Sequence, residues 1–262
     1  MRMGAFAVGA LCVLVRCMEL NLTNKRALVF ASSQGIGRGI AEALIGEGAR
    51  VVLNSSNEER LQAARRQLGA EAYIVKDHSL PNAGAELVAE AVGLLGGLDI
   101  LVLNGGGPPT GTFEELSLDT WRSAFQDVWM TPVEAVSEAL PHMRSQSFGR
   151  IILITSLVAK EPLAALTISS SFGAGLLGLI NTLAEQLGPS GITVNSIMPG
   201  YTDTERLKHV RQDPSSLAQS IPMRRLGTPE ELGRFAAFLA SEHGGYFTGH
   251  AFAYDGGALK GI

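Results

Sequence analysis

The chain has 262 residues, of which 46% are hydrophobic and 18% charged, a balance that excludes an intrinsically disordered protein. Its 31 glycines follow no three-residue period and prolines number only 11, which excludes collagen. A net charge of -4 and a pI near 5.8 provide no basic field, so we expect a small-molecule partner rather than nucleic acid or an anionic membrane.

An apolar run near the N-terminus, residues 3–15, is shorter than the about 20 residues that cross a bilayer, and no small-residue cleavage site follows it. We interpret residues 1–17 either as sequence upstream of a native start at Met18 or as a tethering or packing segment. Residues 18–262 form the remaining domain and contain no cysteine, which excludes a disulfide framework and a cysteine metal site there. We expect a cytoplasmic protein without a metal centre.

Apolar runs of strand length then alternate with amphipathic stretches of helix length. The apolar runs are hydrophobic throughout, which indicates strands buried on both faces, as in a parallel sheet covered by helices. The strand runs are 26–30, 50–53, 72–75, 99–104, 150–155, 192–198 and 251–254, and the helical stretches are 37–49, 57–69, 81–95, 118–143, 170–188 and 228–241. The alternation predicts a single doubly wound, Rossmann-type α/β domain, with a mostly parallel seven-stranded sheet and helices on both faces.

A glycine turn directly follows the first strand run and precedes a helical stretch. Free amides and the helix dipole bind a pyrophosphate at such a helix N-terminus, although a plain strand-to-helix connection uses the same residue types. The candidate phosphate-binding residues are Ser32, Ser33, Gly35, Ile36 and Gly37, with Arg38 as a further donor. A literal G-x-G-x-x-G occurs at 173–178, but no strand leads into it, so we expect helix there.

The end of the second strand run indicates the cofactor type. An acidic residue there favours NAD, whereas polar groups accommodate the 2′-phosphate of NADP. Here Ser55 and Ser56 follow the strand, and the first carboxylate is that of Glu58. We therefore predict NADP(H) in preference to NAD(H). Asp77, after the third strand run, either closes the adenine pocket or caps a turn.

The polar segment 203–227, broken by two prolines, follows the sixth strand run. In a doubly wound sheet this position lies at the carboxyl edge of the strands, where ligands bind. We expect a mobile insertion here, of which residues 203–225 form the substrate pocket together with residues 106–113 and 157–166.

Five segments together resemble the short-chain dehydrogenase/reductase family. They are the GIG turn, LVLNGGG at 101–107, GRIILITS at 149–156, GITVNSIMPG at 191–200, and GTPEELGRFAAFLAS…YFTGHAFAYDGG near the C-terminus. The resemblance covers residues 20–258, and parts are similar to bacterial 3-oxoacyl-acyl carrier protein reductases. The first glycine of the family's loop corresponds to Ala31, and its N-N-A-G reads Leu-Asn-Gly-Gly at 103–106.

This resemblance assigns cofactor contacts to residues that match the family pattern. Asn104 and Gly105 would line the adenosine side of the cofactor. The nicotinamide end would be held by Pro199, Gly200, Thr202 and Thr204, with Ile197 packed nearby.

The family's catalytic tetrad of serine, tyrosine, lysine and asparagine carries over only at Ser156, which would hold the substrate oxygen. Ser169, Gly173 and Val128 occupy the positions that correspond to the tyrosine, the lysine and the asparagine. A neighbouring ammonium can bring the pKa of a tyrosine toward working pH, but not that of a serine. Loss of a general acid costs about 10²–10⁴ in rate.

Three functions remain open on the sequence alone. The first is an NADP(H)-dependent oxidoreductase of a carbonyl or alcohol, in which Tyr201, another relocated residue or water supplies the proton; Lys160 and Glu161 are more simply a solvated pair. The second is a catalytically silent dinucleotide-binding protein, acting as a sensor or as a subunit of an oligomer. The third, a cofactor-independent lyase like the halohydrin dehalogenases, is weaker because those relatives rebuild the glycine loop and keep the tyrosine.

The resemblance also implies an oligomer, since family members pair their fourth and fifth long helices across two-fold axes. The second of these helices carries small residues that would allow close approach, namely Ser170, Ser171, Gly173, Gly175 and Gly178. We therefore expect a homotetramer or a homodimer.

Overall fold

The computed structural model describes residues 19–210 and 214–261, and the interpretation of residues 1–17 lies outside this part of the chain. Its centre is a seven-stranded sheet in the order β3-β2-β1-β4-β5-β6-β7, in which every neighbouring pair is parallel. The strands are β1 Arg26–Val29, β2 Arg50–Ser55, β3 Ala72–Val75, β4 Ile100–Leu103, β5 Gly149–Ile154, β6 Ile192–Pro199 and β7 Ala251–Tyr254. The predicted fold class is confirmed.

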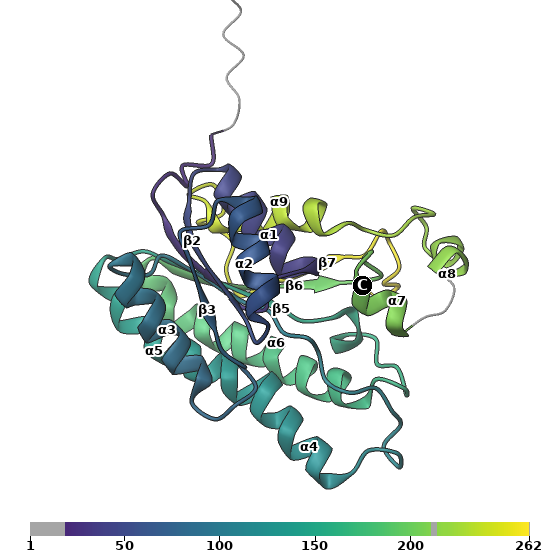
Figure 1. Cartoon of the computed structure of the whole chain (residues 1–262). Coiled ribbons are helices and arrows are strands. Elements are labelled where there is room, and N and C mark those ends of the chain that lie inside the picture. The colour runs from purple at the N-terminus through teal and green to yellow at the C-terminus, as the bar shows by residue number, and fades with distance from the viewer. Residues whose placement is uncertain (1–18, 211–213, 262) are drawn as a thin grey trace, which may run out of the picture.

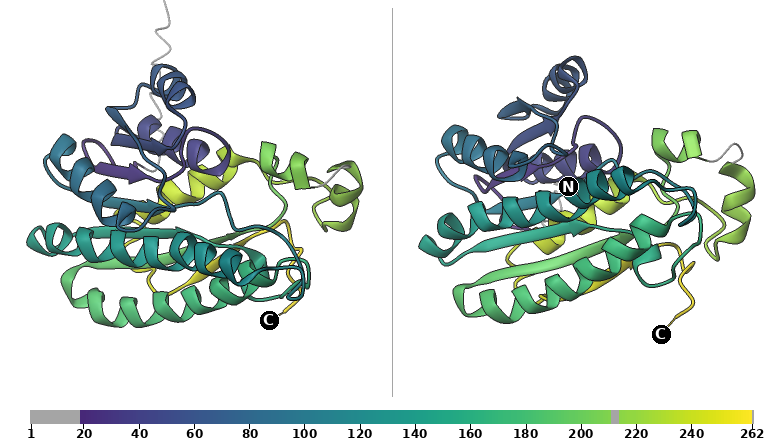
Figure 2. Two further views of the ribbon diagram at one scale, coloured as in Figure 1. Left: turned by 60° about the horizontal axis from the view of Figure 1, so that its bottom comes forward. Right: turned by 90° about the horizontal axis from the view of Figure 1, so that it is seen from below.

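Helices cover both faces of the sheet (Figures 1 and 2). One apolar core lies between the sheet and α1, α2 and α9, and a second lies between the sheet and α3, α5 and α6. The helices are α1 Gly35–Gly46, α2 Glu58–Leu68, α3 Ala83–Leu95, α4 Leu118–Phe125, α5 Thr131–Ser145, α6 Thr167–Leu187, α7 Glu205–Val210, α8 Pro214–Ser220 and α9 Pro229–Ala240.

Two segments differ from the sequence expectations in detail. The helical stretch 118–143 is interrupted between α4 and α5 by a π-helix, η1 Gln126–Met130. Such π-bulges occur often at functional sites. The insertion 203–227 contains the short helices α7 and α8, which project at one edge of the molecule (Figure 1).

The literal G-x-G-x-x-G at 173–178 lies inside α6, as predicted. Gly173 packs against Ala159 of a short 3-10 helix, η2 Leu157–Ala159, and Gly175 packs against Trp129. Residues 167–190 are long and apolar enough to span a membrane by length and composition alone. However, α6 buries Ile168, Leu176 and Ile180 against the sheet, as the core helix of an α/β domain does.

Helices α1 and α9 touch through two glycines. A Cβ atom added at Gly233 of α9 would lie 2.2 Å from the carbonyl oxygen of Gly39, and one added at Gly39 would lie 2.4 Å from the carbonyl oxygen of Pro229. Both added contacts would be with backbone, which cannot rotate away. The helices therefore approach as closely as their backbones allow.

We predict that Gly233→Ala lowers the free energy of unfolding by about 1–3 kcal/mol, because it overpacks this contact. Gly93→Ala is the matched control, since Gly93 is an exposed residue of α3 with no atom near an added Cβ. It should raise stability by about 0.5–1 kcal/mol through helix propensity. Urea denaturation measures both variants, and equal effects would contradict the close-contact interpretation.

Candidate active site

A cleft with a volume of about 1040 Å³ lies at the carboxyl ends of β1, β4, β5 and β6. This volume is at the upper end of the roughly 300–1,000 Å³ typical of ligand pockets. Residues expected at the site that line the cleft are Ile36, Asn104, Gly105, Val128, Ser156, Ser169, Gly173, Pro199, Gly200, Tyr201, Thr202 and Thr204. The fold thus brings the expected nicotinamide-side residues and Ser156 to one cavity.

The glycine turn reaches this cleft through Ile36 alone. The other residues expected to bind the cofactor lie outside the cleft lining, namely Ser32, Ser33, Gly35, Gly37, Ser55, Ser56 and Asp77. Gly35 has a φ of +57° and faces Thr204, whose Cγ2 would lie 3.5 Å from an added Cβ. Gly37 has no room for a side chain, since an added Cβ would lie 2.4 Å from the carbonyl oxygen of Ala31. Ala31, which corresponds to the family's first loop glycine, has a φ of +47°, a region that disfavours side chains. Ala31 therefore adopts the left-handed conformation that a glycine takes more easily.

Ser32 is fully buried, and its hydroxyl donates to the carbonyl oxygen of Val29 at 2.7 Å and accepts from the backbone N–H of Asn54 at 3.0 Å. These bonds tie the turn to β2. The side chain of Ser32 therefore fixes the conformation of the turn. Gly35, Ile36 and Gly37 form the first turn of α1.

The end of β2 is polar and carries no carboxylate. The hydroxyl groups of Ser33 and Ser55 are hydrogen-bonded at 3.1 Å, which joins the glycine turn to this strand end, and Ser56 is exposed. Asp77 accepts hydrogen bonds from the backbone N–H and the hydroxyl of Ser79, and these bonds lower the pKa of Asp77. Of the two roles considered for Asp77, the turn cap is the one visible here.

Ser156 lies two residues after the end of β5 and is the N-cap of η2. Its Oγ accepts a long hydrogen bond, 3.4 Å, from the backbone N–H of Val158, which leaves the hydroxyl hydrogen able to point into the cleft. Ser169 lies in the first turn of α6 and Gly173 one turn further, on the same cleft wall. A Cβ atom at Gly173 would lie 3.1 Å from the Cβ of Ala159. Helix α6 and η2 are therefore packed at the distance that a glycine allows.

Tyr201 lines both the large cleft and a neighbouring cavity of about 200 Å³. Its carbonyl oxygen accepts a hydrogen bond of 3.0 Å from Gly227, at the end of the 203–227 insertion. Glu231, in the first turn of α9, forms an ion pair with Arg225 close to this point. Hydrogen bonds from Arg225 and Tyr254 lower the pKa of Glu231 to about 2. The backbone of Tyr201 is thus tied to the end of the insertion.

Glu161 also lines the cleft, and it accepts hydrogen bonds from the backbone N–H groups of Lys260 and Gly261 at 2.7 and 2.8 Å. This contact ties the β5–α6 loop to the C-terminal segment. The expectation of a solvated pair with Lys160 is wrong for Glu161, because its carboxylate is used by the backbone of the tail.

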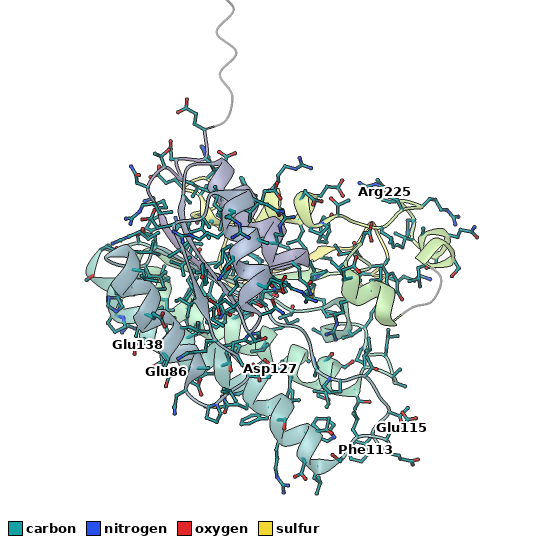
Figure 3. All side chains as sticks on the ribbon, viewed as in Figure 1. Glu86, Phe113, Glu115, Asp127, Glu138 and Arg225 are labelled. Carbon is teal, nitrogen blue, oxygen red and sulfur yellow. The ribbon has the colours of Figure 1, made fainter. Side chains whose placement is uncertain are left out.

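Sequence reasoning missed three side chains of the cleft, His78, Asp127 and Arg206. Asp127, which Figure 3 labels near the middle of the molecule, lies in η1, with its Oδ1 3.4 Å from Nε2 of His78. Arg206 of α7 donates to the carbonyl oxygens of Gly107 and Pro108 at 3.1 and 3.2 Å. No spacing in the sequence signals this cluster, because its members come from three distant elements.

Comparison with known proteins agrees with this arrangement. A family model described as enoyl-(acyl carrier protein) reductase matches residues 30–258. The 3-oxoacyl-[acyl-carrier-protein] reductase FabG of Aquifex aeolicus is 32% identical, over 92% of this chain and 99% of its own. Human dehydrogenase/reductase SDR family member 4 is 33% identical, over 90% of this chain and 88% of its own. The chain belongs to the short-chain dehydrogenase/reductase family. The predicted family is therefore confirmed.

Solved structures of the family superimpose closely on the structure of this chain. The L-sorbose reductase of Gluconobacter frateurii, crystallised with NADPH and L-sorbose, has a TM-score of 0.88 and 31% identity, and the match covers 94% of this chain and all of that one. Because the chain belongs to this family, it is a short-chain dehydrogenase/reductase-type oxidoreductase. The observed sheet, glycine turn and cleft agree with this assignment.

Proposed function

We propose that the chain is an NADP(H)-dependent reductase of a carbonyl substrate whose acid–base group departs from the family pattern. The observation that carries the proposal is the convergence of Ser156 and residues 199–204 on one cleft, beside a β2 end that bears hydroxyl groups and no carboxylate. Relatives named as reductases, one solved with NADPH, favour this reading over a silent binding protein.

The residues present fit a dinucleotide. Helix α1 begins at Gly35, so its first N–H groups have no partner within the helix and can bind the pyrophosphate. Asn104 and Gly105 would hold the adenosine side, and Pro199, Gly200, Thr202 and Thr204 the nicotinamide end. Ser33, Ser55 and Ser56 would donate to the 2′-phosphate, with Arg38 of α1 nearby in sequence. When bound, the cofactor supplies a hydride.

Side chains of the protein would then orient the substrate oxygen and donate a proton to it. Ser156 donates a hydrogen bond to the carbonyl oxygen and orients it. The alkoxide that forms needs a proton, and we propose the Tyr201 phenol as its source, with water in the wide cleft as the alternative. Ser169 and Gly173 stand at the positions of the family's tyrosine and lysine; the serine hydroxyl is no acid near neutral pH, and glycine has no side chain.

We further propose a cytoplasmic homotetramer or homodimer that uses α5 and α6. Of the small residues expected to meet a second copy, Ser171 and Gly178 are exposed on α6 and would allow two copies of the helix to approach. The expectation is wrong for Ser170 and Gly173, which are buried within the subunit, and Gly175 packs against Trp129 of the same chain.

Ser55→Asp tests the cofactor assignment. A carboxylate at the end of β2 would repel the 2′-phosphate and accept the ribose hydroxyl of NADH. We expect the variant to bind NADPH at least about 5-fold more weakly and NADH no worse than the wild type, since one like-charge contact is worth about 1 kcal/mol or more. Calorimetric titration measures both affinities, with Ser55→Ala as control. Wild-type binding that favours NADH would contradict the assignment.

Ser156→Ala tests the catalytic assignment. Loss of this hydroxyl should lower kcat by about 10²-fold, as loss of one oxyanion donor does, while NADPH affinity stays unchanged. Tyr201→Phe should lower kcat by about 10²–10⁴-fold if the phenol is the acid. Steady-state oxidation of NADPH over a panel of carbonyl compounds provides the readout. An unaltered rate in Ser156→Ala would refute the role of Ser156, and an unaltered rate in Tyr201→Phe would assign proton transfer to water.

A further inference from the structure

Arg206 is a cation of the cleft with unused hydrogen-bonding capacity. Its two hydrogen bonds, to the carbonyl oxygens of Gly107 and Pro108, engage neutral acceptors only. A guanidinium has further N–H groups in its planar fork, and Arg206 forms no ion pair with any residue that the structure describes. The charge of Arg206 is therefore uncompensated at contact distance within the described chain.

The cleft wall shields part of this charge from water, although Arg206 as a residue is exposed. Burial against the cleft wall lowers the pKa of the Arg206 guanidinium, and the field of Asp127 opposes this shift only in part. Asp127 itself lies next to His78, at 3.4 Å, rather than next to Arg206. The lining of the same cleft includes the apolar residues Val158, Leu163 and Leu207. Arg206 nevertheless keeps an exposed surface, so a ligand can reach it.

The position of Arg206 indicates which ligand group would meet it. Its carbonyl partners belong to the loop 106–113 and the residue itself belongs to the insertion 203–227, the two segments expected to form the substrate pocket. The glycine turn, where a pyrophosphate would bind, instead faces Thr204. Arg206 therefore bridges the two sides of the substrate end of the cleft.

We propose that Arg206 is a specificity residue that binds an anionic oxygen group, a carboxylate or a phosphate, of the carbonyl substrate. This inference rests on the proposed function, because it names the substrate class of the same cleft. A planar guanidinium pairs with such groups in bidentate fashion, and charge-assisted hydrogen bonds of this kind are stronger than neutral ones. The substrate is thus an oxo acid or a phosphorylated carbonyl compound, whose anionic end fixes the carbonyl near Ser156.

The test uses the full chain and a series of 2-oxo, 3-oxo and 4-oxo acids, each paired with its methyl ester. In NADPH oxidation assays the wild type should prefer the acid of at least one pair. Arg206→Gln should raise KM for that acid by about 10- to 100-fold, with kcat and the ester nearly unchanged. Arg206→Lys should raise KM for that acid less than Arg206→Gln does, because lysine keeps the positive charge but lacks the two parallel N–H donors of the guanidinium. Arg224→Gln, which removes the same charge from the same insertion outside the cleft lining, should have no effect.

Calorimetry separates failure of this inference from failure of the proposed function. An acid of the series should bind the enzyme–NADP⁺ complex of the wild type and not that of Arg206→Gln, even if no compound of the series is reduced. Equal losses for acid and ester would show that Arg206 only holds the loop, and would overturn the proposal. Weaker NADPH binding by Arg206→Gln with unchanged KM would assign Arg206 to a cofactor phosphate, which also overturns it. Failure of every acid of the series, and of dihydroxyacetone phosphate as a phosphorylated carbonyl compound, to bind the wild-type complex would do the same.

Discussion

Parallel pairing of β1, β4, β5 and β6 is the constraint on which the site depends. Because the four strands run in one direction, the segments that follow them meet at one edge of the sheet. The glycine turn, the loop after β4, Ser156 and the residues after Pro199 come from distant parts of the chain and reach one cleft for this reason. Apolar cores on both faces of the sheet hold this edge in place.

One close contact between α6 and η2 shapes the cleft wall beside Ser156. Gly173 on α6 packs against Ala159 just after Ser156, at a separation that a glycine permits and a longer side chain would disturb. Ser169 and Gly173 line this wall, and in our proposal they stand where the family carries a tyrosine and a lysine. Substrate orientation then falls to Ser156 and, in our proposal, to Arg206, and the proton comes from Tyr201 or water.

Local patterns in the sequence predicted most of the strands and helices that position the site. Uninterrupted apolar runs indicated strands buried on both faces, and the GIG turn after the first strand marked the N-terminus of α1. The π-helix at 126–130 and the neighbouring His78 and Asp127 could not be predicted in this way. They depend on how α4, α5 and the loop after β3 pack in three dimensions, and period or composition carries no information on such contacts. Arg206 was missed because its carbonyl partners lie almost a hundred residues away.

The central claim is that a reductase site operates here with Ser169 and Gly173 in place of the family's tyrosine and lysine. Single-turnover oxidation of bound NADPH, followed by stopped-flow absorbance, tests it most directly in the wild type and in the variant Ala159→Gly/Ser169→Tyr/Gly173→Lys. Ala159→Gly relieves the contact at Gly173. The account predicts measurable hydride transfer in the wild type and an acceleration of about 10²–10⁴-fold in the variant. A variant that folds and binds NADPH but shows no acceleration, or a wild type that transfers no hydride, would contradict it.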